Sequence, residues 1–184
     1  EYRKLGKTGV KVSSICLGTA FRAQDDEEIC IRVIDRALDL GCNFIDSALY
    51  GGGKSEEIVG KAIKEKRDEV FLCTKVFSSL GEGPNRTGLS RLNLMHAVEA
   101  SLQRLQTEHI DLYLLHSFDP ETPLEETLRA LDDMVHQGKV RYIGCSNFRP
   151  WKIIESLWVS DLRHLMSFVC IQNQYNLLNR WELE

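Results

Sequence analysis

The sequence lacks the long apolar run that a membrane span needs. No stretch approaches the ~20 consecutive apolar residues that cross a bilayer. The first residues, EYRKLGKTGVKV, contain no apolar signal-peptide region and no initiating Met, which indicates processing or trimming. An excess of basic residues is also missing, because 23 Lys and Arg against 27 Asp and Glu leave a net charge of −4. We therefore expect no membrane insertion and no general binding to nucleic acid, which requires a basic face.

Cysteine-pairing and zinc-binding motifs are missing as well. The six cysteines form no C-x-x-C pair, and no H-E-x-x-H occurs. Four cysteines stand inside apolar runs, namely Cys16, Cys73, Cys145 and Cys170. A chain of 184 residues can bury a core without disulfides. We expect reduced, mostly buried thiols, a cytoplasmic protein and no metal site.

No low-complexity linker divides the chain, so we expect one domain over residues 1–184. Its 43% apolar and 27% charged residues are ordinary for a globular protein. The N-terminal stretch RKLGKTGVKVS predicts a short β-hairpin. Its turn contains Gly6 and Gly9, and its apolar residues are Leu5, Val10 and Val12.

Six apolar runs follow, and each ends in a polar residue of a kind that does chemistry. The runs end at Thr19, Asp46, Lys75, His116, Ser146 with Asn147, and Gln172. A buried strand has no folding reason to end on Asp, Lys or His, because an unpaired buried charge is costly. Continuous apolar runs are typical of parallel strands buried on both faces. The pattern predicts parallel strands alternating with helices, with their carboxyl ends converging on one site.

Helix signals lie between these runs. Four acids at positions 25–28 favour a first helical turn, and Gly41 can end that helix. Ser55 opens a second helix, and Ser90 can cap a third. The stretch from Thr122 to Glu125 offers an N-cap, a Pro at the first helical position and a capping-box Glu, and Gly138 can end that helix.

Three strand-end side chains and one nearby tyrosine suit proton donation. Asp46 and Lys75 end neighbouring strands and can form an ion pair. Tyr50 follows Asp46 closely enough for its ring to reach the same end of the predicted sheet. A phenol is a poor acid at neutral pH, and a neighbouring ammonium makes it a stronger one. The carboxylate can hold the ammonium, and His116 can orient a carbonyl. A simple charge pair at the strand ends is the structural alternative.

At these residues the chain resembles the aldo-keto reductases, a family of (β/α)8-barrel, NADPH-dependent carbonyl reductases. The resemblance runs through FIDSALYGGGKSEEIVGKAI, FLCTKV, IQNQYNLLNR and the long block DLYLLHSFDPETPLEETLRALDDMVHQGKVRYIGCSNF. It implies an α/β fold of TIM-barrel type, here the first six βα units with the hairpin closing the barrel bottom. It also implies a small-molecule carbonyl substrate and NADPH, with NADH second.

The resemblance also implies roles for individual residues. Tyr50 would be the general acid, with Asp46, Lys75 and His116 completing a catalytic tetrad. The nicotinamide carboxamide would be bound by Ser146, Asn147 and Gln172, which together supply donors and acceptors. The Asp46 side chain and the backbone near Thr19 would line the ribose side of the cofactor.

Two departures from the family pattern stand out. The family places its acid five residues after the aspartate, whereas Tyr50 follows Asp46 by four. Gly51, Gly52 and Gly53 can let the backbone adjust. The chain also contains six βα-type strands where the family has eight, so we expect a C-terminally incomplete barrel.

Three other functions are consistent with parts of the sequence. A chain of this family can serve as a regulatory subunit of a potassium channel, with a bound cofactor and slow turnover. The incomplete barrel can also be a catalytically inactive product. The segment from Ala48 to Ser55 approximates a phosphate-binding loop, but it starts with Ala, and the next strands end in Lys75 and His116 instead of a magnesium-binding Asp.

Overall fold

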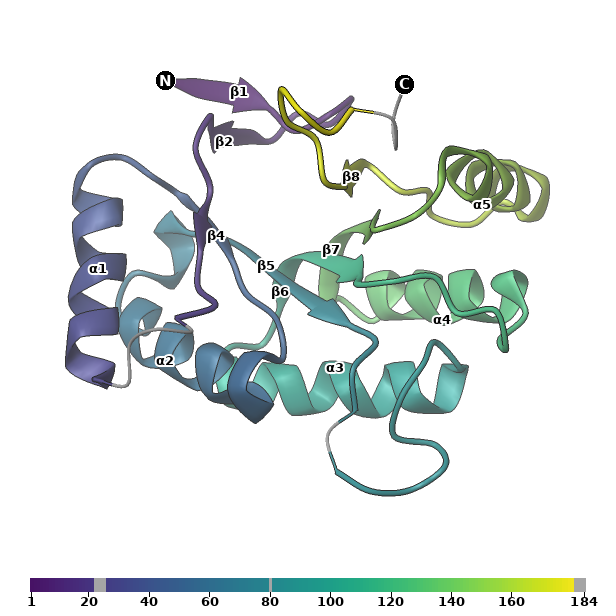
Figure 1. The fold of residues 1–184 in the computed structure, drawn as a ribbon, viewed down its shortest axis with the longest axis horizontal. Coiled ribbons are helices and arrows are strands. Elements are labelled where there is room, and N and C mark those ends of the chain that lie inside the picture. Colours follow the sequence, from purple (N-terminus) through teal and green to yellow (C-terminus); the bar gives the residue numbers. More distant parts are fainter. Residues whose placement is uncertain (22–25, 80, 181–184) are drawn as a thin grey trace.

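A computed structural model describes residues 1–21, 26–79 and 81–180 (Figure 1). A two-stranded antiparallel hairpin precedes a six-stranded sheet in which every strand is parallel to its neighbours. The hairpin strands are β1 (Tyr2–Lys4) and β2 (Lys11–Ser13). The sheet strands run in chain order: β3 (Leu17–Gly18), β4 (Phe44–Asp46), β5 (Phe71–Val76), β6 (Ile110–Leu115), β7 (Val140–Ser146) and β8 (Cys170–Gln172).

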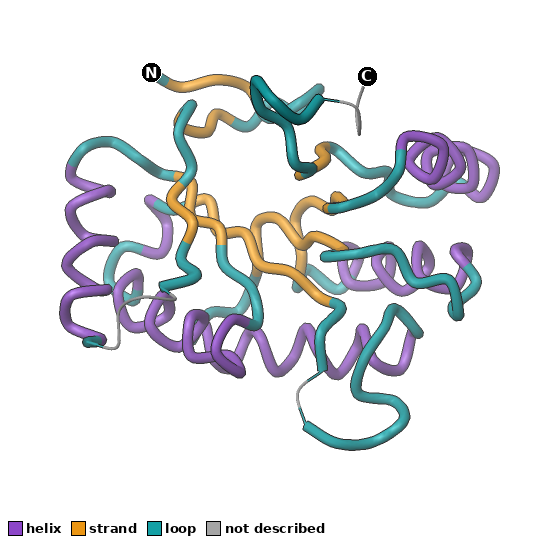
Figure 2. Tube along the Cα trace, in the orientation of Figure 1, coloured by secondary structure: helices purple, strands orange, loops and turns teal. Residues whose placement is uncertain are grey.

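Helices connect the parallel strands and cover the outer side of the curved sheet (Figure 2). They are α1 (Glu27–Asp39), α2 (Lys54–Ile63), α3 (Arg91–Leu105), α4 (Leu124–His136) and α5 (Pro150–Arg163), with 3₁₀ turns η1 (Tyr50–Gly53) and η2 (Arg67–Glu69). This alternation confirms the α/β fold class predicted from the apolar runs. The arrangement is that of an open, barrel-type sheet with an antiparallel hairpin at one end.

Helix ends follow the predicted signals in most places. Asp26 caps α1 by accepting the backbone N–H groups of Glu28 and Ile29, whereas the predicted first-turn Asp25 lies outside the described residues. Ser90 caps α3 by accepting the N–H of Asn93. Gly41 and Gly138 follow α1 and α4 at φ of +85° and +75°, a conformation that favours Gly.

The predicted capping box of α4 is wrong. The helix begins at Leu124 with Pro123 as its N-cap, and no side chain caps it. The Thr122 hydroxyl donates instead to Asp119 Oδ2 over 2.8 Å. Asp119 also accepts the N–H groups of Leu89 and Glu121, so it is a stronger local partner for Thr122 than the helix end.

The hairpin covers the concave face of the sheet near the amino ends of the strands. Leu5, Val10 and Val12 pack with inward-facing residues near the amino ends of the strands, a cluster that includes Phe44, Phe71, Leu112 and Tyr142. The turn approaches the strand region closely, because a Cβ added to Gly6 would lie 2.4 Å from the carbonyl oxygen of Val169. Figure 1 shows the hairpin beside β8. The expected closure of the barrel bottom by the hairpin agrees with this packing.

A larger apolar cluster lies between the sheet and the helices. It contains fully buried side chains from both layers, among them Ile34 of α1, Leu94 of α3, Leu131 of α4, Leu72 of β5 and Ile143 of β7. All six cysteines carry free thiols. Cys30, Cys73 and Cys145 are buried, Cys42 and Cys170 are half-buried, and Cys16, which precedes β3, is exposed. One outer surface remains apolar: α5 exposes Trp151, Ile154, Trp158 and Leu162.

Candidate active site

The pleat of the sheet brings the predicted strand-end residues to one face. Successive residues of a strand point to opposite faces, so residues two apart share a face. Phe71, Cys73 and Lys75 therefore form one inward-facing column on β5, and the first two belong to the concave apolar cluster. The same spacing places Asp46 above Phe44, His116 above Leu114, Ser146 above Gly144 and Gln172 above Cys170. The row at the carboxyl ends is thus polar, and the rows beneath it are apolar.

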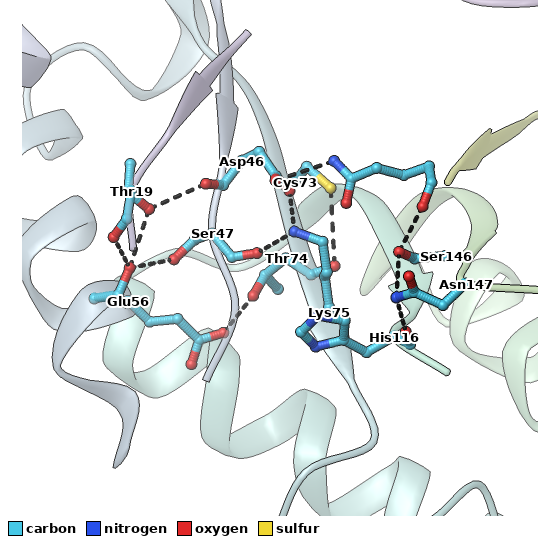
Figure 3. Close-up of polar contacts among 12 residues, drawn as sticks. Thr19, Asp46, Ser47, Glu56, Cys73, Thr74, Lys75, His116, Ser146 and Asn147 are labelled. Carbon is cyan, nitrogen blue, oxygen red and sulfur yellow. Dashed lines mark hydrogen bonds and ion pairs between the residues drawn. The ribbon is translucent and has the colours of Figure 1, made fainter. Parts of the chain in front are cut away.

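Asp46 and Lys75 form a direct ion pair (Figure 3). The Lys75 side chain is 1% exposed and that of Asp46 is 13% exposed. Lys75 Nζ also donates to the carbonyl oxygen of Ser47 over 3.0 Å, and Asp46 Oδ2 accepts Nε2 of Gln172 over 3.1 Å. A buried ammonium survives only with partners of this kind, because desolvation penalises an isolated charge heavily. The ion pair therefore fixes the Lys75 ammonium at one position at the carboxyl ends of the strands.

The Tyr50 ring lies beside this ammonium and beside the ring of His116. Lys75 Nζ lies 6.0 Å from the Tyr50 ring centroid. The rings of Tyr50 and His116 meet edge to face, with centroids 6.1 Å apart and an interplanar angle of 84°. The four-residue spacing from Asp46 to Tyr50 thus still brings the phenol ring into the group.

Glycine conformations make the short loop feasible. Gly51, Gly52 and Gly53 have φ of +60°, +68° and +101°, values that other residues rarely adopt. The chain turns through this segment from η1 directly into α2. The three glycines that follow Tyr50 thus adopt left-handed conformations in the turn that leads into α2.

His116 lies in surroundings that favour a neutral imidazole. Burial lowers the pKa of His116 below its ordinary value, the nearby Lys75 ammonium lowers it further, and the Asp46 carboxylate acts in the opposite direction. Its backbone N–H continues the β5–β6 pairing by donating to Val76. A neutral ring with one donor and one acceptor nitrogen can orient a carbonyl oxygen.

Ser146, Asn147 and Gln172 form a connected polar cluster at the ends of β7 and β8. The Ser146 hydroxyl donates to the Gln172 carbonyl over 2.6 Å. Asn147 Nδ2 donates to the His116 carbonyl over 2.8 Å and to Ser146 Oγ over 3.0 Å. Two primary amides and one hydroxyl within one cluster match the mixed donor and acceptor character of a neutral carboxamide.

Thr19 lies apart from this cluster. It is fully buried, and its hydroxyl lies 3.0 Å from Ser55 Oγ and 3.1 Å from the carbonyl oxygen of Asp46. Ser55 Oγ donates to the carbonyl of Thr19 over 2.6 Å and lies 2.9 Å from Ser47 Oγ. The Thr19 hydroxyl thus joins the ends of β3 and β4 to the start of α2 (Figure 3).

A buried group outside the concave face was missed by the sequence analysis. Glu56 is fully buried, although its place in a first helical turn suggests a solvated acid. Its Oε2 contacts Nε and the terminal nitrogen of Arg104 at 2.7 and 2.6 Å, and its Oε1 accepts the hydroxyl of Thr74 over 2.6 Å. The polar Thr74 inside the apolar run FLCTKV was the available signal, since a buried hydroxyl needs a partner.

No three side chains among His, Cys, Asp and Glu in residues 1–21, 26–79 and 81–180 gather closely enough to hold a metal ion. Over the same ranges, no helix combines the length and apolar character of a membrane span.

Fold and site together define a parallel α/β protein of barrel type with a polar cluster at the carboxyl ends of its strands. A sequence model of the Aldo/keto reductase family matches residues 14–184. The chain belongs to this family, as the motif resemblance predicts.

Three curated relatives match nearly the whole chain. An uncharacterized oxidoreductase, YrpG, of Bacillus subtilis is 42% identical over 98% of this chain and 59% of its own length. A probable voltage-gated potassium channel subunit beta of Arabidopsis thaliana is 35% identical over 100% of this chain and 58% of its own length. Versiconal hemiacetal acetate reductase of Aspergillus parasiticus is 36% identical over 99% of this chain and 61% of its own length. The chain thus spans about three fifths of the length of these relatives.

Proposed function

We propose that the chain forms the proton-donating part of an oxidoreductase that reduces aldehydes or ketones to alcohols with a nicotinamide cofactor. The observation that carries this proposal is the buried Asp46–Lys75 ion pair with the rings of Tyr50 and His116 beside it. Family membership and two relatives named as an oxidoreductase and a reductase support it. As a catalytic tetrad, these four residues would act on a single carbonyl oxygen.

The proposed roles follow from charge and hydrogen bonding. When bound, the cofactor supplies a hydride to the carbonyl carbon. Tyr50 gives its phenolic proton to the carbonyl oxygen, which completes the alcohol. The Lys75 ammonium stabilises the negative charge that remains on the phenol oxygen, and Asp46 holds the ammonium in place. Neutral His116 orients the carbonyl before proton transfer.

The donor set at the ends of β7 and β8 fits a nicotinamide carboxamide. Asn147, Ser146 and Gln172 would hold this group beside the tetrad, and Asp46 with the backbone near Thr19 would lie on its ribose side. By family resemblance we propose NADPH, with NADH second. A small carbonyl compound is the proposed substrate, and the six free thiols favour a cytoplasmic location.

The test compares the wild-type chain with a Tyr50→Phe variant. Each is mixed with NADPH and a panel of reactive carbonyl compounds while cofactor absorbance is followed. We expect Tyr50→Phe to lose at least about 100-fold in turnover, in the range of general acid catalysis, while NADPH affinity measured by fluorescence stays within about twofold. Tyr142→Phe is the matched control, because Tyr142 belongs to the apolar cluster beneath the site. Equal turnover of wild type and Tyr50→Phe would remove Tyr50 from the mechanism.

A regulatory role is the second candidate, and the 35% identity to a probable potassium channel subunit beta favours it. In that case the chain would bind the cofactor tightly and turn over slowly. Tight NADPH binding with turnover close to that of Tyr50→Phe would support this second function. An absence of any cofactor fluorescence change would instead indicate a catalytically inactive product.

A further inference from the structure

The segment that carries Tyr50 contacts a buried ion pair on the helical side of the sheet. Tyr50 begins η1, and Gly53 ends it one residue before α2. A Cβ added to Gly53 would lie 2.6 Å from Cδ and 2.7 Å from Nε of Arg104. The end of this turn therefore packs directly on the side chain of Arg104, which belongs to the last turn of α3.

Arg104 is held in place by the fully buried Glu56. Its Nε and a terminal nitrogen contact Glu56 Oε2 at 2.7 and 2.6 Å, and the terminal nitrogen also donates to Ser101 Oγ over 3.3 Å. The other oxygen of Glu56 accepts the hydroxyl of Thr74, the residue directly before Lys75. One buried carboxylate thus connects the start of α2, the end of α3 and the end of β5.

The segment before this turn borders a pocket on its α3 side. A pocket lined by Leu49, Lys75, Ala97, Ser101 and Arg104, among other residues, lies between η1 and α3. Leu49, the residue before Tyr50, therefore lies at the edge of this pocket. The glycines that follow Tyr50 have no side chains to anchor the turn, and the last of them, Gly53, packs on the side chain of Arg104.

We infer that Glu56 and Arg104 are positioning residues that hold the Tyr50 turn against the Lys75 ammonium. The inference rests on the proposed role of Tyr50 as general acid. It adds two residues that neither touch the reacting atoms nor face the concave site. A displacement of about 1 Å in a reacting group can lower a rate about 100-fold, so loss of this support should affect turnover more than cofactor binding.

The first test removes charge with little change of shape. Glu56→Gln is compared with Asp111→Asn, because Asp111 also pairs with an arginine, Arg67, over 2.7 Å, but is half-buried and lies near the amino end of the sheet. We expect Glu56→Gln to lower kcat about 100-fold, with KM for NADPH within about twofold. Asp111→Asn should leave both constants unchanged within about twofold.

Glu56→Gln can fail to fold, because it leaves Arg104 without its carboxylate. The double variant Glu56→Leu with Arg104→Met removes both charges together and keeps similar volume, which proteins tolerate better. We expect this variant to fold, as judged by a cooperative unfolding transition, and to show the same loss in kcat. Arg104→Lys keeps a cation beside Glu56, so this single variant should retain most of the wild-type kcat.

A measurement without cofactor or substrate separates this inference from the proposed function. With Tyr and His ring labels, a nuclear Overhauser contact reports the edge-to-face packing of Tyr50 on His116. We expect this contact in the wild type and in Asp111→Asn, and its loss in the folded double variant. A folded double variant that keeps the contact and wild-type kcat would overturn the inference. Wild-type turnover in Tyr50→Phe would instead overturn the proposed function, whatever the ring contact shows.

Discussion

Asp46 and Lys75 face each other from the carboxyl ends of adjacent parallel strands, and the Lys75 side chain is almost completely removed from solvent. Their contact joins β4 to β5 on the concave face, where the rows beneath are apolar. Stability and proposed chemistry therefore depend on the same pair.

Asp46→Asn should destabilise the fold strongly. The change leaves the buried Lys75 ammonium without its carboxylate, and breaking a buried pair in this way costs about 3–5 kcal/mol. Urea unfolding would measure the loss in the free energy of unfolding. Asp35→Asn is the control, because its pair with Lys66 is exposed and is worth at most about 1 kcal/mol. Equal losses for both variants would show that burial of the Asp46 pair has no special energetic weight.

Stability should decrease as the pH falls below about 6.5. Burial lowers the pKa of both His109 and His116, so each ring binds its proton more weakly in the folded chain than in the unfolded chain. As the pH falls through the unfolded value of 6.5, the unfolded chain takes up protons first and is favoured. This stabilisation is therefore fully present above that value and decreases toward the lower folded pKa.

Urea unfolding at about pH 7.5 and about pH 5.5 would measure this dependence. His116→Gln should show a smaller loss between the two pH values than the wild type. His96→Gln, an exposed position on α3, should keep the wild-type dependence. A wild-type stability that stays constant or rises on acidification over this range would contradict the prediction.

Gly60→Ala should destabilise the contact between α2 and α3. Alanine improves helix propensity by about 1 kcal/mol over glycine. Its Cβ, however, would lie 2.7 Å from the carbonyl oxygens of Arg104 and Leu105, and backbone atoms there cannot rotate away. Overpacking of this kind costs about 1–3 kcal/mol, so we expect a net loss in thermal unfolding. Gly9→Ala meets nothing within 4 Å and is the control; a Gly60→Ala variant more stable than the wild type would show that the helices separate easily.

The exposed apolar side chains of α5 should affect self-association more than stability. Ile154 and Trp158 are 67% and 66% exposed. Replacing both with Lys should change the free energy of unfolding by no more than about 0.5 kcal/mol for each substitution. Light scattering should show less aggregation, because a smaller apolar surface remains exposed. Leu131→Ala is the contrasting variant, since Leu131 is fully buried and its truncation costs about 2–5 kcal/mol.

The parallel strands and the placement of the polar row could be predicted from the sequence. Apolar runs that end in Asp46, Lys75 and His116 required parallel strands, and the pleat then brought these ends together. The hairpin and most helix ends followed from turn and capping residues. These features depend on local patterns that a single sequence displays.

The failures involve contacts between residues far apart in the chain. Thr122 was assigned to a helix cap, but Asp119 provides it with a better acceptor. The burial of Glu56 was missed, because its partner Arg104 lies 48 positions further along the chain. The short Asp46–Tyr50 loop could be flagged but not resolved from sequence, because its outcome depends on glycine φ angles and on packing against α3.

The hairpin beneath the polar row has a further effect. Leu5, Val10 and Val12 pack on the concave face at the amino ends of the strands, whereas Lys75 and His116 lie at the carboxyl ends. Substitutions in this apolar cluster are therefore expected to affect stability, and substitutions in the polar row are expected to affect the proposed chemistry. Exchanging Val12 for Ile should therefore change the melting temperature, while the proposed carbonyl reduction stays unchanged.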